Sequence, residues 1–172
     1  MDDEARDSKF ANVLAFLFCC FFYWQIIFEK SEWIFLDYLN LAYHEAGHLL
    51  FHFGGEVLYF FGGTLGQLLA PLVIAVAFFF RGQTFAATLM LFWMSENCVN
   101  IARYCADAVA MELPLVGGDT HDWNWLLSHY GKLLECDLYA DRLRVLGFSA
   151  MTLCLGVSFV LLVMSWFRKE ED

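Results

Sequence analysis

The sequence predicts an all-α polytopic membrane protein, and three observations carry this prediction. Hydrophobic residues make up 60% of the 172-residue chain, and its mean hydropathy is +0.53. Apolar residues normally make up about half of a globular chain, so a soluble domain of this length has too small an interior to bury so many. Finally, apolar runs recur at about the 20-residue length that crosses a ~30 Å hydrocarbon core. We therefore treat residues 1–172 as a single integral membrane domain.

About five such runs are expected to cross the bilayer. The first is rich in Phe and lacks a small-residue cleavage site, so it is interpreted as a membrane helix and not as a removed signal. Pro71 lies in the third run, where membrane helices accommodate the lost hydrogen bond. In the fourth run, Asn100, Tyr104 and Asp107 share one helical face that could line a cavity. An i, i+4 ion pair of Arg103 with Asp107 at the membrane surface is an equal alternative. The predicted spans are residues 10–28, 33–53, 65–80, 84–107 and 146–167.

A short segment between the second and third spans has a different pattern. Two Gly-Gly pairs, Gly54-Gly55 and Gly62-Gly63, flank a β-branched and aromatic run. This composition favours an extended segment or hairpin over residues 54–64. An exposed strand edge at membrane depth could pair with an extended substrate, although a plain loop is an equal alternative.

The second span carries the most informative motif, His-Glu-x-x-His. His44 and His48 are four residues apart, so a helix places both imidazoles on one face, close enough to bind one zinc ion. Glu45 lies about 100° round the helix, from where it can reach a metal-bound water without ligating the metal. Ionisable residues inside a membrane helix are functional by default, which argues against two merely hydrogen-bonded histidines. We therefore predict a metal site with Glu45 as general base.

A second polar stretch could supply the third ligand. Asp119 follows Gly117-Gly118 and is predicted to cap a helix running to about residue 134, with His121 and Asp122 in its first turn. A carboxylate and an imidazole side by side could provide a zinc ligand and the group that orients it. With five crossings, spans three and four go out and back, so this stretch returns to the side of the membrane on which the second span ends.

Charge and cysteine usage exclude several classes of protein. The formal net charge is −10, and no patch is basic enough for nucleic acid. The six cysteines form no C-x-x-C pair, so neither a disulfide framework nor a cysteine zinc site is indicated. Basic residues near the proposed site, Arg103, Lys132, Arg142 and Arg144, favour the cell (inner) membrane with the site toward the cytoplasm. Arg168-Lys169 would then lie outside, which counts against that orientation.

Residues 33–126 resemble the site-2 protease family of intramembrane zinc metalloproteases. The resemblance rests on His44-Glu45-Ala46-Gly47-His48 in a membrane helix, followed by a Gly-rich segment and a later Gly-Gly and Asp motif. It implies that His44 and His48 are zinc ligands and that Glu45 is the general base. In that family the third ligand is an Asp that precedes a Gly-Gly pair. Here the order is reversed, which leaves Asp122 and His121 ranked equally, with Asp119 behind.

The resemblance implies hydrolysis of peptide bonds in a membrane protein or peptide by zinc-activated water. A substrate helix must unwind to expose its carbonyls, and Asn97 or Asn100 could hold its backbone or the oxyanion. We expect no fused peptide-binding module, and we therefore expect substrate selection to come from the membrane core, an oligomer or an accessory partner.

Two alternatives belong to other classes of protein. The first is a non-proteolytic metal- or haem-binding membrane protein, in which a haem would need His121 or His129 to face a second histidine inside the membrane. A catalytically silent scaffold would use the Phe-rich helices for packing alone. Neither alternative gives Glu45 a task.

Overall fold

In the part of the chain that the computed structural model describes, residues 2–28, 33–116 and 119–167, every regular element is a helix. This confirms the all-helical prediction. Two motifs used above, Gly117-Gly118 and Arg168-Lys169, lie outside the described residues. The elements in order are α1 (Asp2–Phe28), α2 (Phe35–Phe51), η1 (His52–Gly54), α3 (Glu56–Phe80), α4 (Thr84–Ala106), α5 (Asp122–His129), η2 (Leu133–Glu135) and α6 (Cys136–Phe167).

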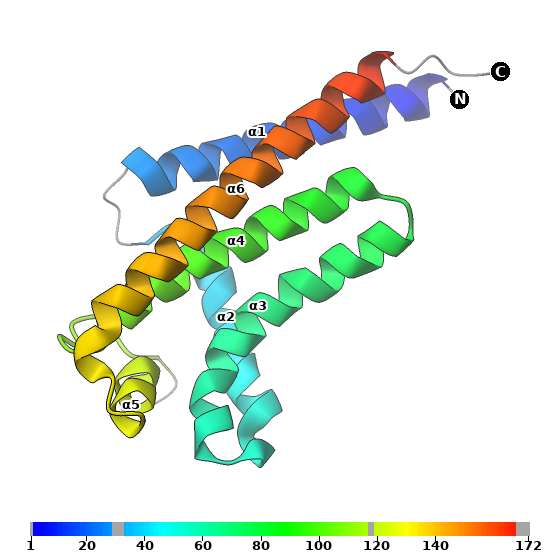
Figure 1. Ribbon diagram of the computed structural model, residues 1–172. Coiled ribbons are helices and arrows are strands. Elements are labelled where there is room, and N and C mark those ends of the chain that lie inside the picture. The colour runs from blue at the N-terminus through cyan, green and yellow to red at the C-terminus, as the bar shows by residue number, and fades with distance from the viewer. Residues whose placement is uncertain (1, 29–32, 117–118, 168–172) are drawn as a thin grey trace.

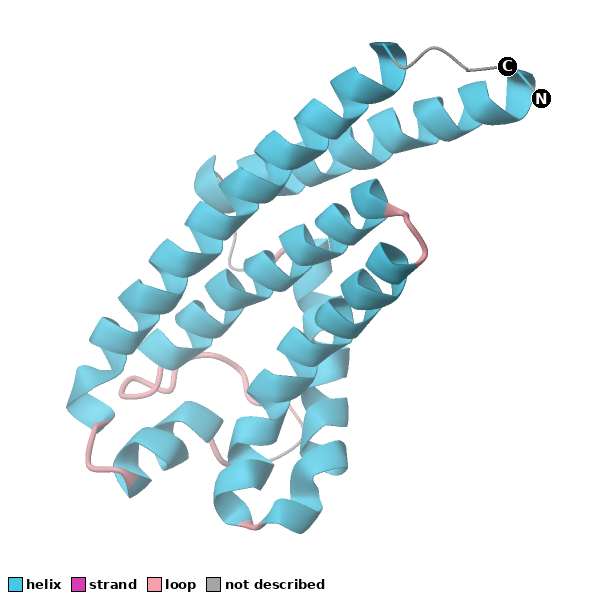
Figure 2. Cartoon of the chain, turned by 45° about the vertical axis from the view of Figure 1, so that its right-hand side comes forward, coloured by secondary structure: helices cyan, strands magenta, loops and turns pink. Residues whose placement is uncertain are grey.

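Helix α4 is the central helix of the fold (Figure 1). α6 packs along it, and α1 lies against α6. α3 runs antiparallel to α4 and is joined to it by a tight turn in which Gly82 has a φ of 73° (Figures 1 and 2). No residue of α4 from Phe85 to Ala106 is exposed. Phe92 shows how it packs: this side chain is 2% exposed and lies in one cluster with Cys19 of α1 and Met151 of α6.

Two short elements complete the fold around α3. α2 packs against α3, and α5 lies between the N-terminal part of α3 and the end of α4. Phe60 of α3 stacks on Trp125 of α5 with ring centroids 4.3 Å apart, and Leu127 of α5 joins a buried cluster with Ala102 and Cys105 of α4. These contacts fix the start of α5 beside α2.

Within residues 2–28, 33–116 and 119–167, three helical segments are long and apolar enough to cross a membrane: Lys9–Phe28, Glu56–Phe80 and Leu133–Phe167. They correspond to the first, third and fifth predicted spans. The second and fourth predicted spans are also helical, as α2 and α4, but both carry buried polar residues that lower their hydropathy. The described part of the chain therefore has three membrane-like helices by length and composition, and the count of five stays a prediction.

The prediction of an extended segment over residues 54–64 is wrong. Gly54 ends a 3-10 turn, Gly55 has a φ of 84°, and α3 runs without a break from Glu56. A continuous helix pairs every backbone group within the segment, and this outweighs the β preference of the aromatic and β-branched run. Only Gly54-Gly55 acts as a chain break.

The second glycine pair serves close packing instead. A Cβ on Gly47 of α2 would collide with the backbone oxygen of Gly62 of α3, and a Cβ on Gly63 would stand 2.5 Å from the His44 ring. Small residues at such contacts let two helix backbones approach closely, as is common between membrane helices. The imidazole of His44 thus fits between α2 and α3 only because residue 63 has no side chain.

Adding one methyl group at this contact should destabilise the fold. We expect Gly47→Ala to lower the free energy of unfolding by about 1–3 kcal/mol, because the new Cβ overlaps backbone that cannot rotate away. Gly156→Ala is the control, since a Cβ there meets no heavy atom within 4 Å; it should stabilise slightly, by up to about 1 kcal/mol. Denaturation by SDS in mixed micelles measures both. Equal effects of the two substitutions would contradict the close α2–α3 packing.

Candidate metal centre

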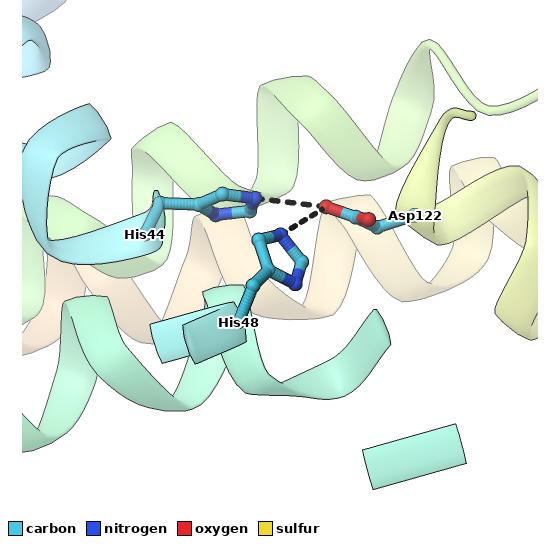
Figure 3. A group of neighbouring side chains, drawn as sticks. All are labelled: His44, His48 and Asp122. Carbon is cyan, nitrogen blue, oxygen red and sulfur yellow. Dashed lines mark hydrogen bonds and ion pairs between the residues drawn. The ribbon is translucent and has the colours of Figure 1, made fainter. Parts of the chain in front are cut away.

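Two histidines of α2 and one aspartate of α5 converge at a buried point. The Nε2 atom of His44 lies 2.8 Å from Oδ2 of Asp122, and the Nε2 atom of His48 lies 3.3 Å from the same oxygen (Figure 3). Their ligand atoms all lie within 4.8 Å of one another, and within the described residues these three form a group that could hold a metal ion. The structure thus brings Asp122, among the three candidates for the third ligand, to the histidine pair.

The donor set suits zinc. Zinc binds imidazole nitrogen and carboxylate oxygen at about 2.0–2.2 Å, so ligands on a tetrahedral ion stand about 3.3 Å apart. The observed separations of 2.8 Å and 3.3 Å need only small side-chain rotations to admit an ion. Three protein ligands would leave a fourth position for water or substrate, which is the arrangement of catalytic rather than structural zinc sites.

Acceptors behind both rings set the protonation of the histidines. Nδ1 of His44 lies 3.0 Å from Oε1 of Gln67, and Nδ1 of His48 lies 2.8 Å from the backbone oxygen of Tyr59. Each acceptor favours a hydrogen on Nδ1, so Nε2 is the nitrogen that faces Asp122 and whose lone pair a metal ion would take. Both acceptors come from α3, so the close α2–α3 contact also selects the metal-binding tautomer.

Gln67 is held in turn by a buried polar network. Its Nε2 donates to Oδ1 of Asn100 at 2.9 Å and to Oδ1 of Asn97 at 3.3 Å, so its carbonyl oxygen must face His44. Asn100 donates to Asp37 at 2.6 Å, and Arg103 donates to the same carboxylate at 3.1 Å. The network therefore links the start of α2 to the His44 ring through α3 and α4.

Asn97 and Asn100, predicted to contact substrate, lie in this network. The side-chain nitrogen of Asn97 donates to the backbone oxygen of Trp93 at 3.0 Å, and that of Asn100 donates to Asp37. Asn97 is fully buried, whereas Asn100 also borders a hollow described below. Both stand behind His44, and a role for them in substrate binding stays a prediction.

Neither His121 nor Asp119 belongs to the group of possible ligands found among the described residues. Nδ1 of His121 accepts the backbone N–H of Asn124 at 3.2 Å, so His121, not Asp119 as predicted, is the N-cap of α5. Its Nε2 lies 3.4 Å from Asp107, and its ring stacks on Tyr104. The N-cap differs from the predicted one because α5 begins at Asp122. Asp119 is exposed in the preceding loop.

Burial and hydrogen bonding act in opposite directions on the pKa of His121 and on that of Asp122. Burial lowers the pKa of His121 below its ordinary value, which favours the neutral ring. Burial alone would raise the pKa of Asp122, but hydrogen bonds from His44 and His48 outweigh it and lower that pKa. Asp122 is accordingly an ionised carboxylate, the form that a metal ion requires.

Two hollows flank the candidate metal centre. The Trp33 hollow is lined in part by Trp33, Leu41, His44, Glu45, Tyr104 and residues 113–116. The Tyr59 hollow is lined in part by Glu45, His48, Tyr59, Tyr104, Asp119 and Asp122. Glu45 is half-buried and borders both. It stands beside the three candidate ligands without belonging to their group.

Two contributors to the site were not singled out from the sequence. Gln67 is a lone uncharged polar residue in an apolar span, and that isolation was the available signal. The backbone oxygen of Tyr59 could not have been found from the sequence, since any residue at this position has a backbone carbonyl. His129, considered for a haem site, is exposed and stacks on Trp125, away from the histidine pair.

The fold and site together define a helical chain with membrane-like helices and a buried His-His-Asp group that could hold a metal ion. No protein-family model matches the chain, and no curated protein or solved structure is significantly similar to it. The resemblance to the site-2 protease family therefore rests on the residues of the motif alone.

The choice between Asp122 and His121 as third ligand can be tested directly. We expect Asp122→Asn to lose most bound zinc, because a neutral amide is a poor ligand. His121→Asn should keep one zinc per chain, since Asn is itself a good N-cap. Elemental analysis of the purified proteins gives the stoichiometry. Zinc retained in Asp122→Asn and lost in His121→Asn would reverse the assignment.

The acceptor behind His44 should matter for affinity. Gln67→Met keeps the side-chain volume but removes the bond to Nδ1, so the zinc affinity should fall about 10- to 100-fold. Thr152→Val on α6, which breaks a hydrogen bond to Tyr23 far from the site, is the control and should leave affinity unchanged. Competition with a fluorescent chelator measures both. Identical affinities in the two variants would remove Gln67 from the site.

Proposed function

We propose that this protein is an integral-membrane zinc metalloprotease of the site-2 protease type that hydrolyses peptide bonds of membrane-associated substrates. The observation that carries the proposal is the convergence of both Nε2 atoms on one carboxylate oxygen, with each Nδ1 held by an acceptor and Glu45 beside them. A purely structural network would not need two imidazoles to share one carboxylate oxygen beside open hollows. His44, His48 and Asp122 are the proposed zinc ligands.

The exposed face of α2 supports a location inside the bilayer. On this helix the buried face is polar, including Asp37, Asn40, His44 and His48. The exposed face carries only apolar and aromatic residues, namely Phe35, Tyr38, Leu39, Ala42, Ala46, Leu49 and Leu50. A water-facing helix has the opposite polarity. We therefore propose that α2 and the central α4 complete five membrane-crossing helices.

The proposed orientation follows the distribution of basic residues. Arg103, Lys132, Arg142 and Arg144 lie toward the end of the fold that holds α5 and the metal centre. Short basic segments stay on the cytoplasmic side of bacterial-type membranes. We propose that this end faces the cytoplasm of a cell (inner) membrane.

The proposed chemistry assigns each residue one task. Bound zinc would lower the pKa of water from about 16 to near 7 and polarise the peptide carbonyl. Glu45 accepts one proton of the attacking water as the water oxygen bonds to the peptide carbon. At the same time, the π pair of the peptide carbonyl moves to the carbonyl oxygen. When that pair returns, the C–N bond breaks, and Glu45 passes its proton to the leaving nitrogen. One carboxylic acid and one amine result from one water.

The two hollows beside the proposed ligands are consistent with a substrate that binds in an extended form. A helical peptide keeps its carbonyls bonded and shielded, so a membrane segment must unwind before water can attack. The Trp33 hollow offers apolar side chains, including Leu41, Leu113 and Leu115, beside Glu45 and His44. Apolar residues of an unwound segment would lie against these side chains, in place of the strand-edge pairing expected for residues 54–64.

Replacing the general base separates catalysis from metal binding. Glu45→Gln should keep one zinc per chain and abolish hydrolysis, because the amide cannot accept the proton of water. Glu56→Gln, an exposed acid in the first turn of α3, is the matched control and should turn over as wild type does. Cleavage of an internally quenched Leu/Ala peptide in detergent micelles provides the assay. Full zinc together with normal turnover in Glu45→Gln would end the proposed mechanism.

A further inference from the structure

Negative charge develops on the peptide carbonyl oxygen as water adds, and a hydrogen-bond donor at that oxygen can share its stabilisation with the metal ion. The sequence offered Asn97 and Asn100 for this task, but the structure has both side-chain nitrogens donating within the protein. Tyr104 is the alternative. Among the described residues that line the two hollows, it is the one hydrogen-bond donor that borders both.

The Tyr104 side chain is held in place from two sides. Its ring stacks on His121 with centroids 4.1 Å apart and planes 25° apart, and it meets the His44 ring edge-on at 5.8 Å. Contacts of this kind fix both side-chain torsions of a tyrosine. The hydroxyl therefore has a defined position before substrate binds, which is what electrostatic stabilisation of a transition state requires.

The hydroxyl lies next to the third candidate ligand. Its oxygen accepts the backbone N–H of Asp122 at 3.2 Å. This bond uses a lone pair of the phenol oxygen and leaves the hydroxyl hydrogen for another acceptor. His121, whose ring packs against Tyr104, also caps α5 and so places the Asp122 N–H. Tyr104 and the candidate metal ligand are thus held by one local arrangement.

We propose that Tyr104 is a catalytic residue whose O–H donates a hydrogen bond to the peptide carbonyl oxygen as that oxygen gains negative charge. The inference rests on the proposed protease function and deepens it. The hydroxyl keeps its proton throughout: the bond strengthens as the π pair moves to oxygen and weakens when the C–N bond breaks. Tyr104 therefore stabilises the transition state more than the bound substrate, so its loss should lower kcat with little change in KM.

The test uses Tyr104→Phe in the full chain, because Phe keeps the ring contacts and removes only the hydroxyl. With the quenched Leu/Ala peptide in micelles, kcat should fall about 100- to 1,000-fold with unchanged zinc content. Two inhibitors add a readout independent of turnover. A phosphinic Leu-Leu peptide, whose tetrahedral oxygens resemble the charged intermediate, should bind at least about tenfold more weakly, while a Leu-Leu thiol, which offers no such oxygen, should bind as before.

Tyr130→Phe is the matched control, since Tyr130 is 61% exposed at the end of α5 and should behave as wild type. If Tyr104→Phe keeps the wild-type kcat, or loses zinc or affinity for both inhibitors equally, Tyr104 is structural and the inference is overturned, while the protease function stands. If wild type cleaves no better than Glu45→Gln, the protease function itself is overturned, and this inference with it.

Discussion

The structure depends on one arrangement: two imidazoles on α2 aim their Nε2 atoms at one carboxylate oxygen of α5, while α3 holds their Nδ1 atoms from behind. Each ring is thus fixed at both nitrogens. Burying two imidazoles and a carboxylate is unfavourable unless they are paired or bind a metal, so their convergence is a costly feature for a chain to keep without use. The Gln67 network and the cap at His121 both serve this arrangement.

The close contact between α2 and α3 makes that arrangement geometrically feasible. Because Gly47, Gly62 and Gly63 carry no side chain, the helices approach until a backbone oxygen of α3 can reach His48 and the His44 ring lies over Gly63. Larger residues would separate the helices and move both Nδ1 acceptors out of reach. The same contact turns the polar face of α2 inward, and the exposed face is left apolar. Packing, tautomer selection and the proposed immersion of α2 in the bilayer therefore share one cause.

Local spacing made much of this predictable, and tertiary contacts decided the rest. The i, i+4 relation of His44 and His48 holds on any helix, and each of the five predicted spans is helical in the structure. The third ligand could not be chosen from sequence, because Asp122 and His121 are adjacent and only the docking of α5 decides which faces α2. The glycines near residue 62 were misread, since close packing and extended structure both favour glycine. The isolation of Gln67 in an apolar span was a signal in the sequence, but its partner His44 followed only from the register between α2 and α3.

The central claim is that a zinc ion is bound by two imidazoles and one carboxylate. Zinc K-edge X-ray absorption on the purified wild-type protein tests it most directly, because the chain also contains six free cysteines that could compete for the metal. The account predicts one zinc with two imidazole nitrogens and light oxygen ligands, all at about 2.0–2.2 Å, and no sulfur. A sulfur shell near about 2.3 Å, or a single imidazole, would contradict it.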